Sequence, residues 1–182
     1  MTFSSLKGTA IVLSMLFSLT VYADAQQQSS DFQTICTDAW MKKADKAKDK
    51  VDYKNFGEKY CSCAAKQPLE NDDAVKKAIQ LCMSRTLLHD AMDSLEDEIT
   101  LSKAKESDIN DYCLDRWSVV LPQQTEDDKK LINAYCQCAQ PKLMDLIRQS
   151  DTMTDNEYEA GIDKVADHCV ENSLVTKPTP TQ

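Results

Sequence analysis

Apolar residues recur at three- and four-residue intervals along most of this 182-residue chain, which is the period of an amphipathic helix. In the first such stripe, Phe32, Ile35 and Trp40 fall on one helical face. Six stripes of this kind predict helices over residues 30–44, 53–68, 71–87, 107–121, 125–139 and 154–170. We expect residues 89–105 to extend the third helix and link two halves of the chain, and residues 141–153 to add a short helix.

The scarcity of turn-forming residues supports an all-α fold. The chain holds only 3 glycines and 5 prolines, so many short strands joined by tight turns are not expected. Several stripes begin with residues that commonly cap helices. These candidate caps are Ser30 with Gln33, Asn71 to Asp73, Thr125 and Thr154. The few glycines also exclude Gly-rich phosphate-binding loops and the G-x-S-x-G motif of many hydrolases.

The eight cysteines divide into two sets with the same order. Each set has one cysteine, then a C-x-C pair, then one more cysteine, at positions 36, 61, 63 and 82 and at positions 113, 136, 138 and 169. The first cysteine of each set lies in Ser-Asp-x-x-x-x-Cys-x-Asp-x-Trp, and each pair lies in Tyr-Cys-x-Cys-Ala. This pattern predicts two homologous units of three helices each, packed with approximate two-fold symmetry as one helical domain.

Residues 1–25 are typical of a secretory signal peptide. Lys7 precedes an apolar run over residues 10–22, and Ala23-Asp24-Ala25 is an A-x-A cleavage site. The run is shorter than the about 20 apolar residues of a membrane span, so no stable membrane anchor is expected. We therefore predict a signal peptide (1–25), a first four-cysteine repeat (26–100), a second one (101–172) and a disordered tail (173–182).

Export gives the cysteines a structural interpretation, because disulfides persist in oxidising compartments. In a helix, residues two positions apart project about 200° from each other, so Cys61 and Cys63 point to opposite sides and cannot easily bond together. We expect each C-x-C pair to bond to the two outer cysteines of its set, at about 3 kcal/mol for each bridge. The eight bonded residues are then Cys36, Cys61, Cys63, Cys82, Cys113, Cys136, Cys138 and Cys169, with the pairing inside each set left open.

Two pairs of aromatic residues repeat with the cysteines. Trp40 and Trp117 follow the first cysteine of each set by four residues, and Tyr60 and Tyr135 precede each C-x-C pair. One interpretation is core packing against the disulfides. The other is a repeated binding surface, and these four residues are our candidates for it.

Charge and residue chemistry exclude several functions. With 30 acidic and 21 basic residues the net charge is −9, which disfavours nucleic acid as a partner. Four cysteines per set suit Zn²⁺ and C-x-C suits Cu(I), but structural zinc ligands are usually spaced further apart on turns. A thiol oxidoreductase would use C-x-x-C, which is missing, and the two histidines, His89 and His168, form no Ser/His/Asp motif. We therefore assign no catalytic residue, metal or cofactor.

The pattern C…Y-C-x-C-A…C behind a signal peptide resembles small exported proteins of Gram-negative bacteria, some of them released by type II secretion from intracellular pathogens. The resemblance covers residues 36–82 and 113–169, and it implies a helical protein of the periplasm or the exterior that acts on a host. Plant lipid-transfer proteins also have eight cysteines and one C-x-C, but their adjacent Cys-Cys pair is missing here.

These features predict an exported helical binding protein, periplasmic or secreted, whose partner is a protein or a small apolar ligand. A lipid carrier and a secreted hydrolase without a recognisable motif are the alternatives.

Overall fold

The computed structural model describes residues 20–173, and this range is all-α, as predicted. Residues 1–19, which hold most of the predicted signal peptide, and residues 174–182 lie outside it. The helices are α1 (Thr20–Met41), α2 (Lys50–Ala64), α3 (Asp72–Ile99), α4 (Glu106–Val120), α5 (Glu126–Ile147) and α6 (Asp155–Ser173). Short 3₁₀ turns follow α1, α3 and α5, at Ala44–Lys46, Leu101–Lys103 and Ser150–Thr152. None of the helices described has the length and hydropathy needed to cross a membrane.

Three of the six helices in the described range begin at caps that the sequence predicts, namely Asn71, Thr125 and Thr154. The Asn71 side chain accepts a hydrogen bond from the backbone N–H of Ala74 at 2.9 Å, and α3 begins there. Thr125 opens α5 with a reciprocal capping box. Ser30 was expected to cap the first helix, and this is wrong, because α1 begins ten residues earlier at Thr20. Residues 20–30 contain alanines and glutamines but neither glycine nor proline, so nothing in them stops a helix.

The fifth helix is longer than predicted. It was expected over 125–139, with a separate short helix over 141–153, but α5 continues through Pro141 to Ile147. Pro141 and Gln137 are both exposed, so the Gln137 carbonyl that loses its amide partner lies on the solvent side. Beyond the proline, buried apolar side chains hold the helix in place, and they are Leu143, Met144, Leu146 and Ile147.

The disulfides join the helices as the C-x-C geometry requires. Cys36 bonds to Cys61 and Cys63 bonds to Cys82, so α2 is attached to α1 on one side and to α3 on the other. The second set follows the same order, with the bonds Cys113–Cys136 and Cys138–Cys169. No cysteine is free, and all eight lie within the described residues. The disulfide framework is thus confirmed. In each set, the cysteine before the C-x-C pair bonds to the first cysteine of the pair, and the cysteine after it bonds to the second, which determines the pairing that the sequence left open.

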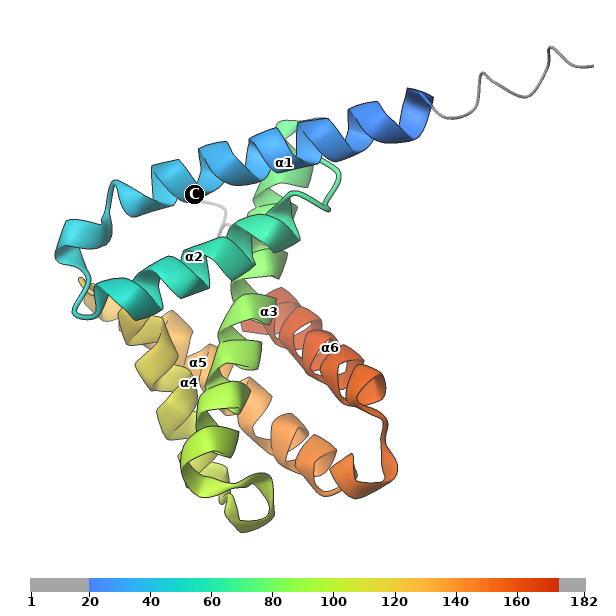
Figure 1. Ribbon diagram of the computed structural model, residues 1–182. Coiled ribbons are helices and arrows are strands. Elements are labelled where there is room, and N and C mark those ends of the chain that lie inside the picture. Colours follow the sequence, from blue (N-terminus) through green and yellow to red (C-terminus); the bar gives the residue numbers. More distant parts are fainter. Residues whose placement is uncertain (1–19, 174–182) are drawn as a thin grey trace, which may run out of the picture.

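Helix α3 connects two packing layers (Figure 1). Its N-terminal half packs against α2, which packs against α1, and its C-terminal half lies with α4, α5 and α6. In that lower part the contacts form a ring, because α3 packs on both α4 and α6, and α5 packs on the same two helices. The main core therefore includes the α3 residues Leu87, Leu88, Met92 and Leu95 together with side chains of α4 to α6. The predicted two-fold relation between two like units stays a prediction.

Candidate functional site: an apolar groove between α1, α2 and α3

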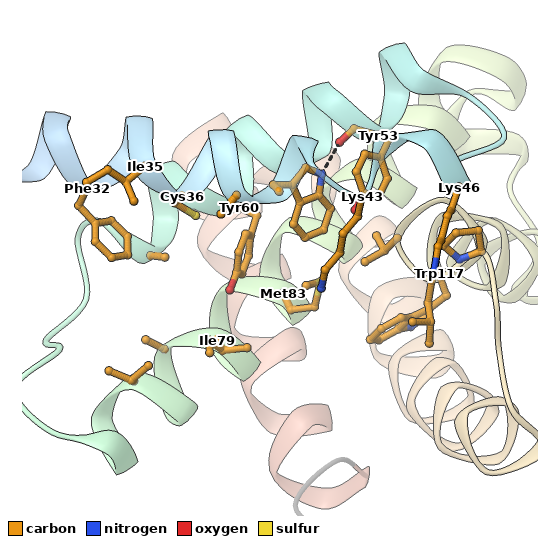
Figure 2. Close-up of a pocket in the computed structure, with 18 of the residues that line it drawn as sticks. Phe32, Ile35, Cys36, Lys43, Lys46, Tyr53, Tyr60, Ile79, Met83 and Trp117 are labelled. Carbon is orange, nitrogen blue, oxygen red and sulfur yellow. Dashed lines mark hydrogen bonds between the residues drawn. The ribbon is translucent and has the colours of Figure 1, made fainter.

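An apolar groove of about 840 Å³ lies between α1, α2 and the N-terminal half of α3 (Figure 2). Phe32, Ile35 and Cys36 approach from α1, Tyr60 comes from α2, and Ile79 and Met83 lie opposite on α3. The last turn of α4 and the residues after it close one end, where Trp117 lines the groove. We call this space the α1–α3 groove.

Trp40 forms part of one wall because a glycine lets it lie flat on α2. A Cβ atom built on Gly57 would be only 2.3 Å from Cδ1 of the Trp40 ring, so the indole rests directly on the helix backbone. The indole N–H donates a hydrogen bond to the Tyr53 carbonyl at 2.8 Å. The ring also stacks on Tyr53, with centroids 4.8 Å apart, and on Phe56, at 5.6 Å. The wall is therefore held in position by several independent contacts.

Tyr60 places a polar atom inside this apolar space. Its ring packs against Trp40 with centroids 5.5 Å apart, and its hydroxyl points across the groove toward α3 (Figure 2). Within the described part of the chain this hydroxyl has no hydrogen-bond partner. Partial burial raises the pKa of Tyr60 above its ordinary value of 10.0, so the hydroxyl is protonated at neutral pH and can donate a hydrogen bond to a ligand.

Two large apolar side chains form the exposed edges of the groove. Ile35 on α1 is 69% exposed and Ile79 on α3 is 46% exposed. The third large apolar residue that is exposed in the described range, Val51, is 67% exposed and does not line the groove. Burying such side chains against a ligand is favourable by about 25 cal/mol for each Å² removed from water.

Two lysines bring positive charge to the end of the groove near α4. Lys43 and Lys46 both line it, and neither forms an ion pair with another described residue (Figure 2). About half of the other lysines and arginines in the described range form ion pairs, for example Lys59 with Asp90 and Asp93. The α1–α3 groove therefore combines a long apolar surface with unpaired positive charge at one end.

The four aromatic residues predicted as a binding surface do not share one environment. Trp40, Tyr60 and Trp117 all line the α1–α3 groove, although Trp117 is largely buried. Tyr135 is fully buried in the core, and its hydroxyl is hydrogen-bonded to the hydroxyl and the carbonyl of Ser84. Burial raises the pKa of Tyr135 far above its ordinary value. Trp40 and Tyr60 were predicted from the sequence as candidates for one binding surface, and both line the groove. Gly57 and the two lysines were not among the candidate residues.

A second, charged cleft of about 480 Å³ lies between α2, α3 and α6 and contains His89. The two ring nitrogens of His89 contact Glu159 at 2.8 Å and Asp163 at 2.9 Å, so neither is left to activate a nucleophile. Arg85 is held by Asp167 through two hydrogen bonds of 2.8 and 2.6 Å. Cys63 also lines the cleft, but it is disulfide-bonded and carries no thiol. The ion pairs and hydrogen bonds of His89 and Arg85 therefore link α3 to α6.

No group of three or more His, Cys, Asp or Glu side chains in the described range is arranged to hold a metal ion. The chain matches no protein-family model, and neither curated proteins nor solved structures show a significant likeness to it. The α1–α3 groove is thus the candidate functional site.

Proposed function

We propose that this protein is an exported binding protein and that the α1–α3 groove is its ligand site. The observation that carries this proposal is the pair of exposed isoleucines, Ile35 and Ile79, on the two edges of an apolar groove. A contiguous apolar surface of this kind is costly to leave in water and usually marks an interaction site. The volume of about 840 Å³ is within the range of known ligand pockets.

The disulfides support the exported part of the proposal. Four bonds that hold every cysteine of the chain are typical of proteins from oxidising compartments. Together with the signal-like sequence at residues 1–25, they favour a protein of the periplasm or the cell exterior. Action on a host is a further part of this proposal, and it rests on the resemblance to secreted bacterial proteins alone.

A matched pair of variants tests the ligand site. Ile35→Asp places a charge on the edge of the groove, and Val51→Asp places the same charge on an equally exposed position outside it. Anilinonaphthalene sulfonate, an apolar dye with an anionic group, is titrated into the oxidised protein, and its fluorescence reports binding. We expect saturable binding that weakens about tenfold in Ile35→Asp and does not change in Val51→Asp. Circular dichroism spectra confirm that both variants are folded.

Either of two results would overturn the proposal. The first is the lack of saturable dye binding to the folded wild-type protein. The second is an equal effect of the two substitutions, which would mean that the dye binds outside the groove.

A small anionic amphiphile, such as a fatty acid, is the second candidate ligand. It is favoured by the unpaired Lys43 and Lys46, which suit a carboxylate at the end of an apolar chain. Competition between the dye and a fatty acid, and its loss when both lysines are replaced by glutamate, tests this candidate.

A further inference from the structure

The cysteine register relates the groove residues of the first half to residues in the second half of the chain. Cys36 corresponds to Cys113, and the residues around them follow in step, so Phe32 corresponds to Ile109 and Trp40 to Trp117. Cys82 corresponds to Cys169 in the same way. Ile79 and Ala166 each lie three residues before these cysteines, so they correspond to each other. These three groove residues are half-buried or exposed, and their counterparts are all buried. For the last pair the exposed fractions are 46% for Ile79 and 0% for Ala166.

A helix covers the counterparts in the second half. The C-terminal half of α3 lies between α4 and α6, and it presents Leu87, Leu88, Met92 and Leu95 to the core that they form (Figure 1). In the first half, α1 and the N-terminal half of α3 are the counterparts of α4 and α6. The described residues include no helix between that pair, and the α1–α3 groove occupies this place. The groove thus has the position that a helix fills in the other half of the molecule.

The two tyrosines that precede the C-x-C pairs support the same comparison. Tyr135 faces α3, and its hydroxyl is hydrogen-bonded to Ser84, which lies three residues before Leu87 at the start of the covering segment. Tyr60, its counterpart, points its hydroxyl into the groove without a described partner (Figure 2). An occupant that covers the half-buried Tyr60 takes its hydroxyl out of water, so an occupant that brings a hydrogen-bond partner for it is favoured.

The charges indicate how such a helix would be oriented. Tyr112 donates a hydrogen bond to Glu98, and Arg116 pairs with Asp90, so α3 and α4 run antiparallel. The N-terminal side of the covering segment therefore lies toward the end of α4, at Val120. The counterpart of Val120 is Lys43.

In the groove, a helix of the same orientation would thus begin beside Lys43 and Lys46. Acidic residues in its first turn would meet both lysines and would also suit the positive end of the helix dipole.

We propose that the α1–α3 groove receives an amphipathic α-helix of another protein, with an apolar stripe along its length and acidic residues in its first turn. This inference rests on the proposed function, because it names the class of partner that the same groove takes. The apolar stripe covers Ile35 and Ile79, and the acidic turn pairs with the two lysines. Helix-in-groove recognition uses this combination of spaced apolar anchors and flanking charges.

Stapled helical peptides test the proposal. The first peptide carries the apolar stripe of α3 from Met83 to Leu95 with glutamates in its first turn, the second has lysines in that turn, and the third has the same composition in scrambled order. Fluorescence anisotropy measures their affinity for the oxidised protein. We expect the acidic peptide to bind about tenfold more tightly than the basic or the scrambled one. Lys43→Glu/Lys46→Glu should reverse the charge preference. Lys42→Glu/Lys48→Glu, the same charge change on exposed lysines outside the groove, should leave it unchanged.

Each other outcome contradicts the proposal in a distinguishable way. Equal binding of the scrambled peptide would mean that no helical stripe is recognised, and an equal effect of the two double variants would place the peptide elsewhere. Binding of the dye or a fatty acid in the groove without binding of the acidic peptide would overturn the helix proposal and leave the proposed function intact. If neither dye nor peptide binds, both proposals fail.

Discussion

Gly57→Ala measures how firmly Trp40 is seated against α2. The new methyl group would lie 2.3 Å from Cδ1 and 2.6 Å from Nε1 of the indole, so the ring has to move. Overpacking of this kind costs about 1–3 kcal/mol, and loss of the indole hydrogen bond to Tyr53 costs about 1 kcal/mol more. Alanine returns about 1 kcal/mol of helix propensity. We therefore expect the free energy of unfolding to fall by about 1–3 kcal/mol.

Gly161→Ala is the matched control for this substitution. Its methyl group would meet Cδ1 of Leu146 at 2.5 Å, but that atom ends a flexible side chain that can rotate away. The cost of an altered rotamer, about 1 kcal/mol, is offset by the same gain in helix propensity, so little net change is expected. Urea unfolding of the oxidised proteins, followed by circular dichroism, gives both values. If Gly57→Ala is as stable as the wild type, the indole is not seated on the helix backbone and the description of this wall is wrong.

Two further predictions concern the edges of the fold. Removing one bond with Cys36→Ala/Cys61→Ala should release α1, which packs on α2, and hydrogen exchange should rise in α1 while α4 to α6 stay protected; unchanged exchange in α1 would contradict this. Hydrogen bonds from Thr125 lower the pKa of Asp128 below its ordinary value of 3.8, so its carboxylate stabilises the fold above that pH and the contribution is lost as the pH falls through the lowered pKa. Asp128→Asn should therefore flatten the loss of stability in urea titrations between about pH 5 and pH 2, and an unchanged pH profile would contradict this.

Local chemistry made much of the fold predictable from the sequence. Asn71 and Thr125 start their helices because their side chains accept hydrogen bonds from free backbone amides, which is a short-range property. The C-x-C pairs indicated their partners because helix geometry alone separates Cys61 from Cys63. The length of α5 was not predicted, because whether a helix continues through a proline such as Pro141 depends on the packing of the residues that follow it.

The groove depends on contacts between distant residues and was harder to anticipate. The apolar residues of α3 from Leu87 to Leu95 lie on one wide helical face, so the burial of this half of the helix in a core could be predicted. Gly57 was a second usable signal, because a lone glycine inside a predicted helix often marks a close approach to the backbone. Neither signal predicts which helices pack against α3 or which side chain packs against Gly57. That Trp40 lies on Gly57 follows from the tertiary structure alone.

The order of the disulfides also determines what a single proteolytic cut does to the chain. Each set of four cysteines is closed on itself, so no bond spans residues 83–112. A cut in the turn between α1 and α2 leaves one covalently connected molecule until a reductant is added. A cut after the exposed Lys103 or Lys105 instead leaves two closed fragments that noncovalent contacts hold together, chiefly the packing of α3 on α4 and α6. The turn at Leu101–Lys103 is thus where a protease in the surrounding medium could divide the protein into separable halves.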